Sequence, residues 1–415
     1  MIDPRKTPAT LSDRIIQACL IFILIFTPLA LGGARLYFLV PVHIVTLFAT
    51  CSYLSRLAIP GRFSFKPTLL GAPLALFVAL AVWSCFNSHY RNDSILAIFR
   101  LLTYVQIFYL VVNAIDTREK MNRLVSILVG MAAFLSLLGL VLYLGHNYYR
   151  YWLPGETLSA TYMNRDHFAG FLEMVIPLAA GFFFTRMEKE KKALVGFLVS
   201  LMLVAFVMAA SRGAWVSLAT ACLVLLPFVS RKRLLNGAVL FVIICGIVVF
   251  YSLSHFDLSG VAARARTIIE GVGIDETRIQ VWMGAVDLIK AHPWLGSGIG
   301  TFIHVFPQYR PIGIYQFWTI DYAHNDWLQT FVELGLGGFL LMAWLVVAAL
   351  WMGLRQFYLT ASSFKRSLSL GASVGILSMA LHSFVDFNLH IPANAITFIV
   401  LAGIIMSLHA RDRYV

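Results

Sequence analysis

Long, continuous apolar runs recur from one end of this chain to the other. Each is close to the ~20 residues that a helix needs to cross the hydrocarbon core of a bilayer. A chain in lipid must satisfy its backbone polar groups internally, so it forms either helices or a closed barrel. Barrel strands alternate in hydrophobicity and these runs do not. With 60% hydrophobic and 13% charged residues, the sequence predicts an all-α polytopic membrane protein.

The runs predict about twelve transmembrane helices. Their approximate ranges are 13–33, 36–55, 68–85, 94–115, 124–144, 167–185, 193–210, 214–229, 236–253, 326–354, 367–385 and 392–410. The first run also fits a secretory signal peptide, because basic residues precede it and small residues end it. The orientation of the other helices is the same under either interpretation. No repeat or soluble domain boundary interrupts the series, so we expect residues 1–415 to form one integral membrane domain.

Basic residues are distributed unevenly over the connections. With the N-terminus inside, the cytoplasmic segments hold 21 of the 32 basic residues against 7 acidic ones, a net charge of +14. The opposite side holds 10 basic and 13 acidic residues, a net charge of −3, and Arg100 lies within a predicted helix. Cytoplasmic loops carry the excess of Lys and Arg, so both termini are expected in the cytoplasm. Basic residues spread over short segments do not predict a nucleic-acid-binding surface.

The longest connection, about 254–325, lies on the outer side between the ninth and tenth predicted helices. Connections of this length are usually functional. Within it, Thr277–Ala291 predicts an amphipathic helix. Its apolar face consists of Ile279, Trp282, Met283, Val286 and Ile289. A glycine-rich turn over 296–300 follows, but no strand precedes that turn, so it is not a dinucleotide-binding fingerprint.

Four arginines are candidates for binding an anion near the outer surface. Arg212 lies in a short turn between two apolar runs, where it is either an interfacial anchor or a ligand contact. Arg278 begins the amphipathic helix and Arg310 follows the glycine turn, and each fits either a solvated surface or a substrate contact. Arg100 lies too deep in its helix for easy snorkelling, so it needs an acid such as Asp386 or an anionic ligand. Several guanidinium groups together suit a diphosphate, to which each donates bidentately.

His324 precedes the tenth predicted helix, where the long connection re-enters the membrane. Histidine readily accepts a proton near neutral pH, so His324 is a candidate general base for a sugar hydroxyl. The alternative is a helix-capping cluster in which Asn325 or Asp326 caps the tenth helix.

Two further polar clusters occur on the outer side, around Arg165 before the sixth helix and around Asp386 before the last. The residues that could converge on a metal ion are Asp166, His167, His324 and Asp386. Metal sites need several convergent ligands, and no spacing here demands one. We therefore predict no metal and keep the metal site as an alternative.

Several sequence blocks resemble the O-antigen ligase and polymerase superfamily. The blocks are Asn164–Gly170, Ser211–Gly213, Arg278 with Trp282, His292–Phe302, Tyr322–Gln329 followed by Glu333–Gly335, and Asp386–Pro392. The resemblance covers about residues 160–395, whereas the first five predicted helices match in hydropathy alone. The combined pattern is fairly specific to the superfamily and does not choose between its members.

The resemblance implies a GT-C-type glycosyltransferase in the bacterial inner membrane, with its active site at the periplasmic face. Such an enzyme takes a glycan from undecaprenyl diphosphate and passes it to an acceptor hydroxyl, which in the ligases belongs to lipid A–core. The reaction is expected to invert the anomeric centre and to need no metal or cofactor. By matching motif, Arg212 and Arg278 would hold the leaving diphosphate and His324 would act at the acceptor hydroxyl. The further substrate-binding candidates are Arg100, Arg165, His167, Arg310, Asn325, Asp326 and Asp386.

Three other functions remain open. A polymerase that lengthens a glycan on its lipid carrier would share the donor and the arginines, and the block Asp386–Pro392 also resembles exopolysaccharide-type members. A protein-acceptor glycosyltransferase is a second alternative. A transporter with twelve helices is a third, although the chain lacks repeated halves and paired broken helices.

Overall fold

The computed structural model describes residues 11–59, 63–145, 158–225, 266, 276–311 and 319–409. Within these residues all regular secondary structure is helical, which confirms the predicted all-α class. The longer helices are α1 Leu11–Leu29, α2 Leu36–Leu54, α3 Gly71–Asn87, α4 Arg91–Ala114, α5 Arg118–Leu144, α6 Arg165–Phe183, α7 Lys189–Met208, α8 Arg212–Leu225, α11 Glu276–Ala291, α13 Asp326–Leu359, α14 Ser363–His382 and α15 Pro392–His409. Shorter helical turns are η2 Leu31–Gly33, η3 Ser55–Ala58, α12 Phe302–Val305, η5 Phe306–Tyr309 and η6 Asn388–His390.

Each predicted transmembrane range overlaps one of these helices, except 236–253, which lies outside the described residues. Among the described helices, eight are long and apolar enough to cross a membrane, and α3 and α8 are shorter apolar helices. The chain is therefore a polytopic helical membrane protein. The count of twelve spans and the GT-C arrangement stay predictions.

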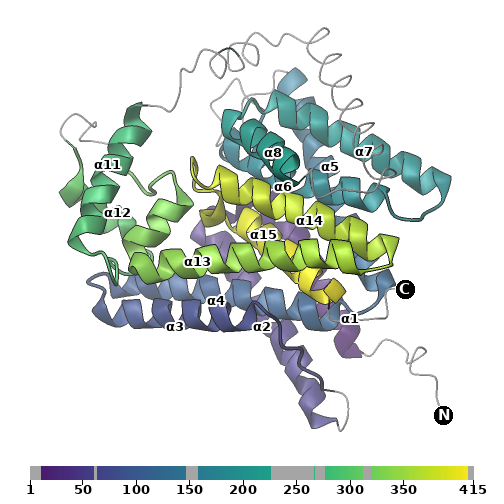
Figure 1. Cartoon of the computed structure of the whole chain (residues 1–415), viewed down its shortest axis with the longest axis horizontal. Helices are drawn as coiled ribbons and strands as arrows, with labels where there is room; N and C mark the ends of the chain where they lie inside the picture. The colour runs from purple at the N-terminus through teal and green to yellow at the C-terminus, as the bar shows by residue number, and fades with distance from the viewer. Residues whose placement is uncertain are drawn as a thin grey trace.

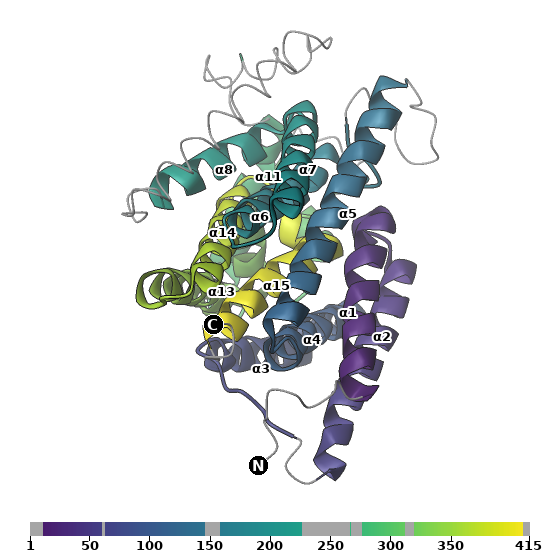
Figure 2. The same ribbon diagram turned by 90° about the vertical axis from the view of Figure 1, so that its right-hand side faces the viewer.

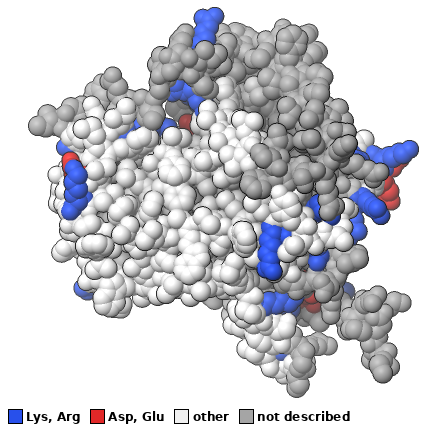
Figure 3. Space-filling view, viewed as in Figure 1, with Lys and Arg blue, Asp and Glu red and all other residues white. Residues whose placement is uncertain are grey.

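Apolar side chains face outward from the bundle in a way that fits lipid. Along α13, the side chains of Leu340, Trp344, Val347 and Trp351 are exposed and share one side of the helix. Soluble proteins rarely expose so large an apolar surface. The face in Figure 3 agrees, because a broad area has no charged side chains and the Lys and Arg groups lie near its margins.

Helix α14 lies at the centre of the bundle, packed against α6, α8, α13 and α15 (Figure 1). Glycines permit its close approach to α6. A Cβ at Gly371 would lie 2.4 Å from the carbonyl oxygen of Pro177, and one at Gly375 would lie 2.7 Å from that of Met174. Small residues at such crossings let two backbones touch. Helix α5 packs on α6 and α7, and Figure 2 shows α5 beside α1.

Helix α13 is interrupted, which the continuous apolar run over 326–354 did not predict. Gly335 adopts φ 64° and ψ −166°, a conformation open essentially to glycine alone. A Cβ there would lie 2.2 Å from the carbonyl oxygen of Trp294. The predicted glycine turn packs against this break, with the amides of Ser297 and Gly298 donating to the carbonyls of Val332 and Glu333, each at 2.9 Å.

The glycine turn is held by a carboxylate of the protein itself. Glu333 is buried, and its two oxygens accept from the amides of Gly300 at 2.7 Å and Phe302 at 3.3 Å. These amides are therefore bonded within the fold, and the turn links the long connection to α13.

The predicted amphipathic helix forms as α11, but the face that packs on the protein differs from the predicted apolar face. Val281, Ala285 and Leu288 are buried against the neighbouring turns. The side chains of Ile279, Met283 and Val286 are exposed. The outward apolar stripe fits a helix that lies at a membrane surface.

Candidate functional site

The connection between α14 and α15 is the centre of the polar site. Helix α14 ends at His382, and the chain then turns through Ser383–Phe387 and η6 before Pro392 begins α15. The start of α13 is fixed to this connection, because the amide of Asp326 donates to the carbonyl of Ser383 at 2.8 Å. We call residues 382–391 the α14–α15 loop.

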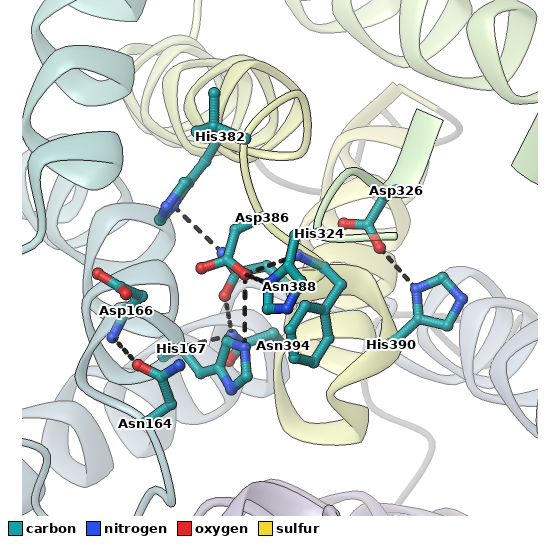
Figure 4. A network of polar contacts seen from close by, with 12 residues as sticks. Asn164, Asp166, His167, His324, Asp326, His382, Asp386, Asn388, His390 and Asn394 are labelled. Carbon is teal, nitrogen blue, oxygen red and sulfur yellow. Dashed lines mark hydrogen bonds and ion pairs between the residues drawn. The ribbon is translucent and has the colours of Figure 1, made fainter. Parts of the chain in front are cut away.

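Asp386 lies between two histidines that come from distant parts of the chain (Figure 4). Its Oδ1 is 3.7 Å from His167 Nε2 and 3.9 Å from His324 Nδ1. The Asp386 side chain is 1% exposed and that of His324 is 35% exposed. The fold thus joins the start of α6, the segment before α13 and the α14–α15 loop, and it brings together three predicted site residues.

The environment of Asp386 favours its ionised form. Burial raises the pKa of Asp386, but the imidazoles of His167 and His324, with His382 nearby, outweigh burial and hold the pKa well below its usual range. At the observed distances neither imidazole makes a full hydrogen bond, and His167 Nε2, His324 Nδ1 and Asp386 Oδ2 are buried without hydrogen-bond partners. A shift of a few tenths of an ångström would close either contact, which is common for sites without substrate.

Phe387 orients the two histidines, and sequence reasoning missed it. Its ring centroid lies 4.7 Å from that of His167 and 4.8 Å from that of His324, both in edge-on contacts. Tyr322 stacks on the same ring at 4.6 Å. Phe387 lies within the block Asp386–Pro392, but nothing in the sequence indicates that the rings of His167, His324 and Tyr322 all contact its side chain.

Asp326 and Asn325 have internal roles. Asp326 Oδ1 accepts from His390 Nδ1 at 2.6 Å, while Oδ2 accepts from Ser383 Oγ and the Leu389 amide, each at 2.9 Å. Asn325 Oδ1 caps α13 by accepting from the Leu328 amide at 2.9 Å, which confirms the capping alternative for this residue. Both side chains therefore hold the α14–α15 loop and His324 in place.

A second carboxylate–histidine pair supports the loop from inside the bundle. His382 Nδ1 lies 2.9 Å from Glu173 Oε1, and Ser378 Oγ donates to Glu173 Oε2 at 2.9 Å. Glu173 and His382 are both buried. Glu173 was also missed, although an acid inside a predicted span is a signal that could have marked it.

Of the two arginines matched by motif, Arg278 contacts the loop directly, and Arg212 begins a helix whose second residue lies against it. Arg278 Nη1 donates to the carbonyl of Val385 at 2.6 Å. Arg212 begins α8 beside Gly213, where a Cβ would lie 2.7 Å from His382 Nε2 and 3.2 Å from Val385 Cγ2. Trp282 Nε1 donates to the carbonyl of Ala323 at 3.0 Å, so α11 also contacts the segment that carries His324.

The remaining predicted arginines belong to other elements of the fold. Arg165 begins α6 two residues before His167, after an Asn164 cap. Arg100 of α4 lies near Tyr322. Burial raises the pKa of Tyr322, and the positive charge of Arg100 opposes that rise. Arg310 directly follows η5, which packs on α11.

The histidines and carboxylates of the site do not form a metal centre in the described part of the chain. No group of three or more His, Cys, Asp or Glu side chains there is arranged to hold a metal ion. The predicted convergence of His167, His324 and Asp386 is real, but it has the geometry of a carboxylate between two imidazoles.

The fold and this cluster define a polytopic helical membrane protein with a polar site built of arginine, histidine and aspartate at the ends of its helices. A family model described as O-antigen ligase matches residues 197–343, which supports the resemblance to the O-antigen ligase superfamily that the motifs predicted. A search of curated proteins finds no match. The matched region contains Arg212, Arg278 and His324, whereas Asp386 and His167 lie outside it.

Proposed function

We propose that this protein transfers a glycan from undecaprenyl diphosphate to an acceptor hydroxyl at the periplasmic face of the bacterial inner membrane. The proposed acceptor is lipid A–core, which makes the reaction the ligation of O-antigen in lipopolysaccharide assembly. The observation that carries this proposal is that Arg278 and His324, from separate elements, both contact the α14–α15 loop, and that α8, which Arg212 begins, packs against α14.

Arg212 and Arg278 suit the leaving side of the reaction. When the bond at the anomeric carbon breaks, negative charge grows on the departing diphosphate. Guanidinium groups that are already in position stabilise the transition state, where this charge develops, more than they stabilise the ground state. The barrier is therefore lower. Arg278 is held by its bond to the Val385 carbonyl, so part of its orientation is set before substrate binds.

His324 suits the acceptor side. Its Nδ1 faces Asp386, which leaves Nε2 to accept a proton from the attacking hydroxyl. An ionised Asp386 stabilises the imidazolium that forms and fixes the tautomer. A single displacement with a base inverts the anomeric centre and needs no covalent nucleophile, and we propose that these residues act without a metal or cofactor.

The other predicted substrate contacts divide into two groups. Asn325 and Asp326 bond within the protein, and His167 and Asp386 lie beside each other near His324. We propose that all four position His324. Arg165 and Arg310 keep their proposed role as contacts to the glycan or its carrier, and both side chains are partly exposed.

An O-antigen or exopolysaccharide polymerase is the second candidate. The donor half of the site would be the same, because both reactions release undecaprenyl diphosphate. The observation in its favour is the Asp386–Pro392 block, which resembles exopolysaccharide-type members. A transporter remains a remote alternative, since the polar residues described above gather at one loop.

Substitution of the three residues tests the proposal. Arg212→Gln, Arg278→Gln and His324→Gln should each lower glycan transfer at least a hundredfold in cells that lack the native gene, with normal protein levels in the membrane. Arg278→Lys should also fail, because an ammonium cannot donate bidentately. The control is Arg35→Gln, an exposed arginine before α2. Full transfer by all three glutamine variants would refute the site.

A further inference from the structure

Arg100 is a charged residue inside a membrane-spanning helix. It lies about 14 Å along α4 from Arg91, at 1.5 Å per residue, and α4 is one of the candidate spans. A charge at that depth is costly and is kept when it has a partner or a function.

The described part of the protein supplies no carboxylate for this guanidinium. Asp386, the acid that the sequence offered as a partner, is taken by His167 and His324. Arg100 Nε is buried and has no hydrogen-bond partner. One turn further along the same face of α4, the hydroxyl of Tyr104 is also buried without a partner. The Arg100 Nε and the Tyr104 hydroxyl are therefore left without a hydrogen-bond partner at this depth.

The surroundings of Arg100 add further polar groups. Tyr322, from the segment before α13, lies close enough to Arg100 to feel its charge. On α2, His43 Nδ1 lies 2.6 Å from Thr103 Oγ1, on the turn of α4 next to Arg100. Of the acids near Tyr322, Glu333 is bonded to the glycine turn and Asp321 is exposed. Among the described residues, neither acid forms an ion pair with Arg100.

This cluster adjoins the histidine pair from a different direction than Arg212 and Arg278. Arg278 meets the α14–α15 loop at Val385, and Gly213, next to Arg212, lies against His382. Tyr322 meets the loop at Phe387, which also contacts both histidines. A guanidinium with phenolic hydroxyls beside it is chemically suited to phosphate oxygens. Its depth in α4 favours a phosphate that is carried on a lipid.

We propose that Arg100, Tyr104 and Tyr322 form a second anion subsite, which binds a phosphate group of a lipid-anchored substrate beside the histidine pair. The substrate identity rests on the proposed function: the phosphate belongs either to a phosphorylated acceptor lipid or to the diphosphate donor. If the phosphate belongs to the acceptor lipid, this subsite would hold the acceptor on one side of His324, and Arg212 and Arg278 would hold the leaving diphosphate on the other.

Binding to the purified full chain in dodecyl maltoside micelles, which contain no phosphate, tests the subsite. The probes are dihexanoyl phosphatidic acid for a lipid phosphate and farnesyl diphosphate for the donor's leaving group. Arg100→Gln should raise the Kd for phosphatidic acid at least tenfold and leave that for farnesyl diphosphate within twofold, and Tyr104→Phe should weaken the same probe less. Arg91→Gln, an exposed arginine at the start of the same helix, is the control.

The outcomes separate the subsite from the proposed function. If Arg100→Gln weakens farnesyl diphosphate instead, the subsite stands and its phosphate comes from the donor. If it weakens neither probe, or if the native protein binds neither, the subsite is wrong. Arg278→Gln reports on the proposed function independently, since it should weaken farnesyl diphosphate alone.

Thermal stability distinguishes a binding role from a structural one. An unpaired buried charge destabilises the ligand-free protein, so Arg100→Gln should have a Tm equal to or above that of the native chain in phosphate-free micelles. A structural role predicts a lower Tm, and a drop of several degrees would contradict the subsite.

Discussion

At the scale of single residues, one buried carboxylate organises the site. Asp386 has two imidazoles within 4 Å and almost no exposure, while its neighbours Val385 and Phe387 contact Arg278 and the histidine rings. The loop therefore transmits any displacement of Asp386 to every group proposed to take part in transfer. We therefore expect the loss of the Asp386 carboxylate to disturb the positions of several proposed site residues, although Asp386 itself is not proposed to touch the substrate.

Asp386→Asn should lower transfer at least tenfold and should also change the pH dependence of stability. Because the pKa of Asp386 is held below its usual range, its ionised form stabilises the fold at every pH above the unfolded value of about 3.9. That contribution is lost as the pH falls through the lower folded value. The Tm difference between native and Asn protein should shrink as the pH falls below about 4. A difference that widens below pH 4 would contradict the ionised assignment.

The residues found from the sequence are those whose chemistry is visible in a short motif. Arg212, Arg278 and His324 each stand in such a motif, and in the structure Arg278 and His324 lie against one loop. Phe387 and Glu173 escaped because their importance arises from tertiary contacts. For Asp326 the motif suggested a substrate contact. In the structure its two carboxylate oxygens instead accept hydrogen bonds from His390, Ser383 and Leu389.

At the scale of elements, hydropathy predicted the helices well and their interruptions poorly. The apolar run over 326–354 continues through Gly335, so nothing in its hydrophobicity marks the break in α13. The break depends on the backbone of Trp294, which lies 41 positions earlier in the chain. For the same reason the packed face of α11 could not be read from its apolar residues, because both lipid and protein accept apolar side chains.

Gly335→Ala tests whether the break in α13 is required. A side chain at φ 64° and ψ −166° costs about 1–3 kcal/mol from backbone conformation alone, and its Cβ would also meet the Trp294 carbonyl. The variant should lose several degrees of Tm and much of its transfer activity. Gly337→Ala is the matched control, because it lies two residues later and its Cβ would be 3.3 Å from a flexible Leu80 side chain. Equal stability of both variants would show that the break is dispensable.

At the scale of the whole molecule, the polar site and the lipid-facing surface are segregated. The histidine and arginine groups meet at the ends of α6, α8, α13 and α14, while exposed apolar side chains follow α2, α3 and α13. This segregation is what the proposed transfer requires, because the lipid of the proposed donor stays in the bilayer. The cytoplasmic placement of both termini stays a prediction of the charge distribution, and residues 254–265 and 267–275 of the long connection lie outside the described residues.

Reconstituted transfer by the purified chain is the most direct test of the central claim. Proteoliposomes containing the protein and a labelled glycan on undecaprenyl diphosphate would be given lipid A–core or a second lipid-linked glycan, with a chelator present throughout. We expect labelled lipid A–core from the native chain and none from Arg278→Gln or His324→Gln. Product on the second lipid-linked glycan alone would make the protein a polymerase. Absence of any product, or equal product from the variants, would contradict glycan transfer at this site.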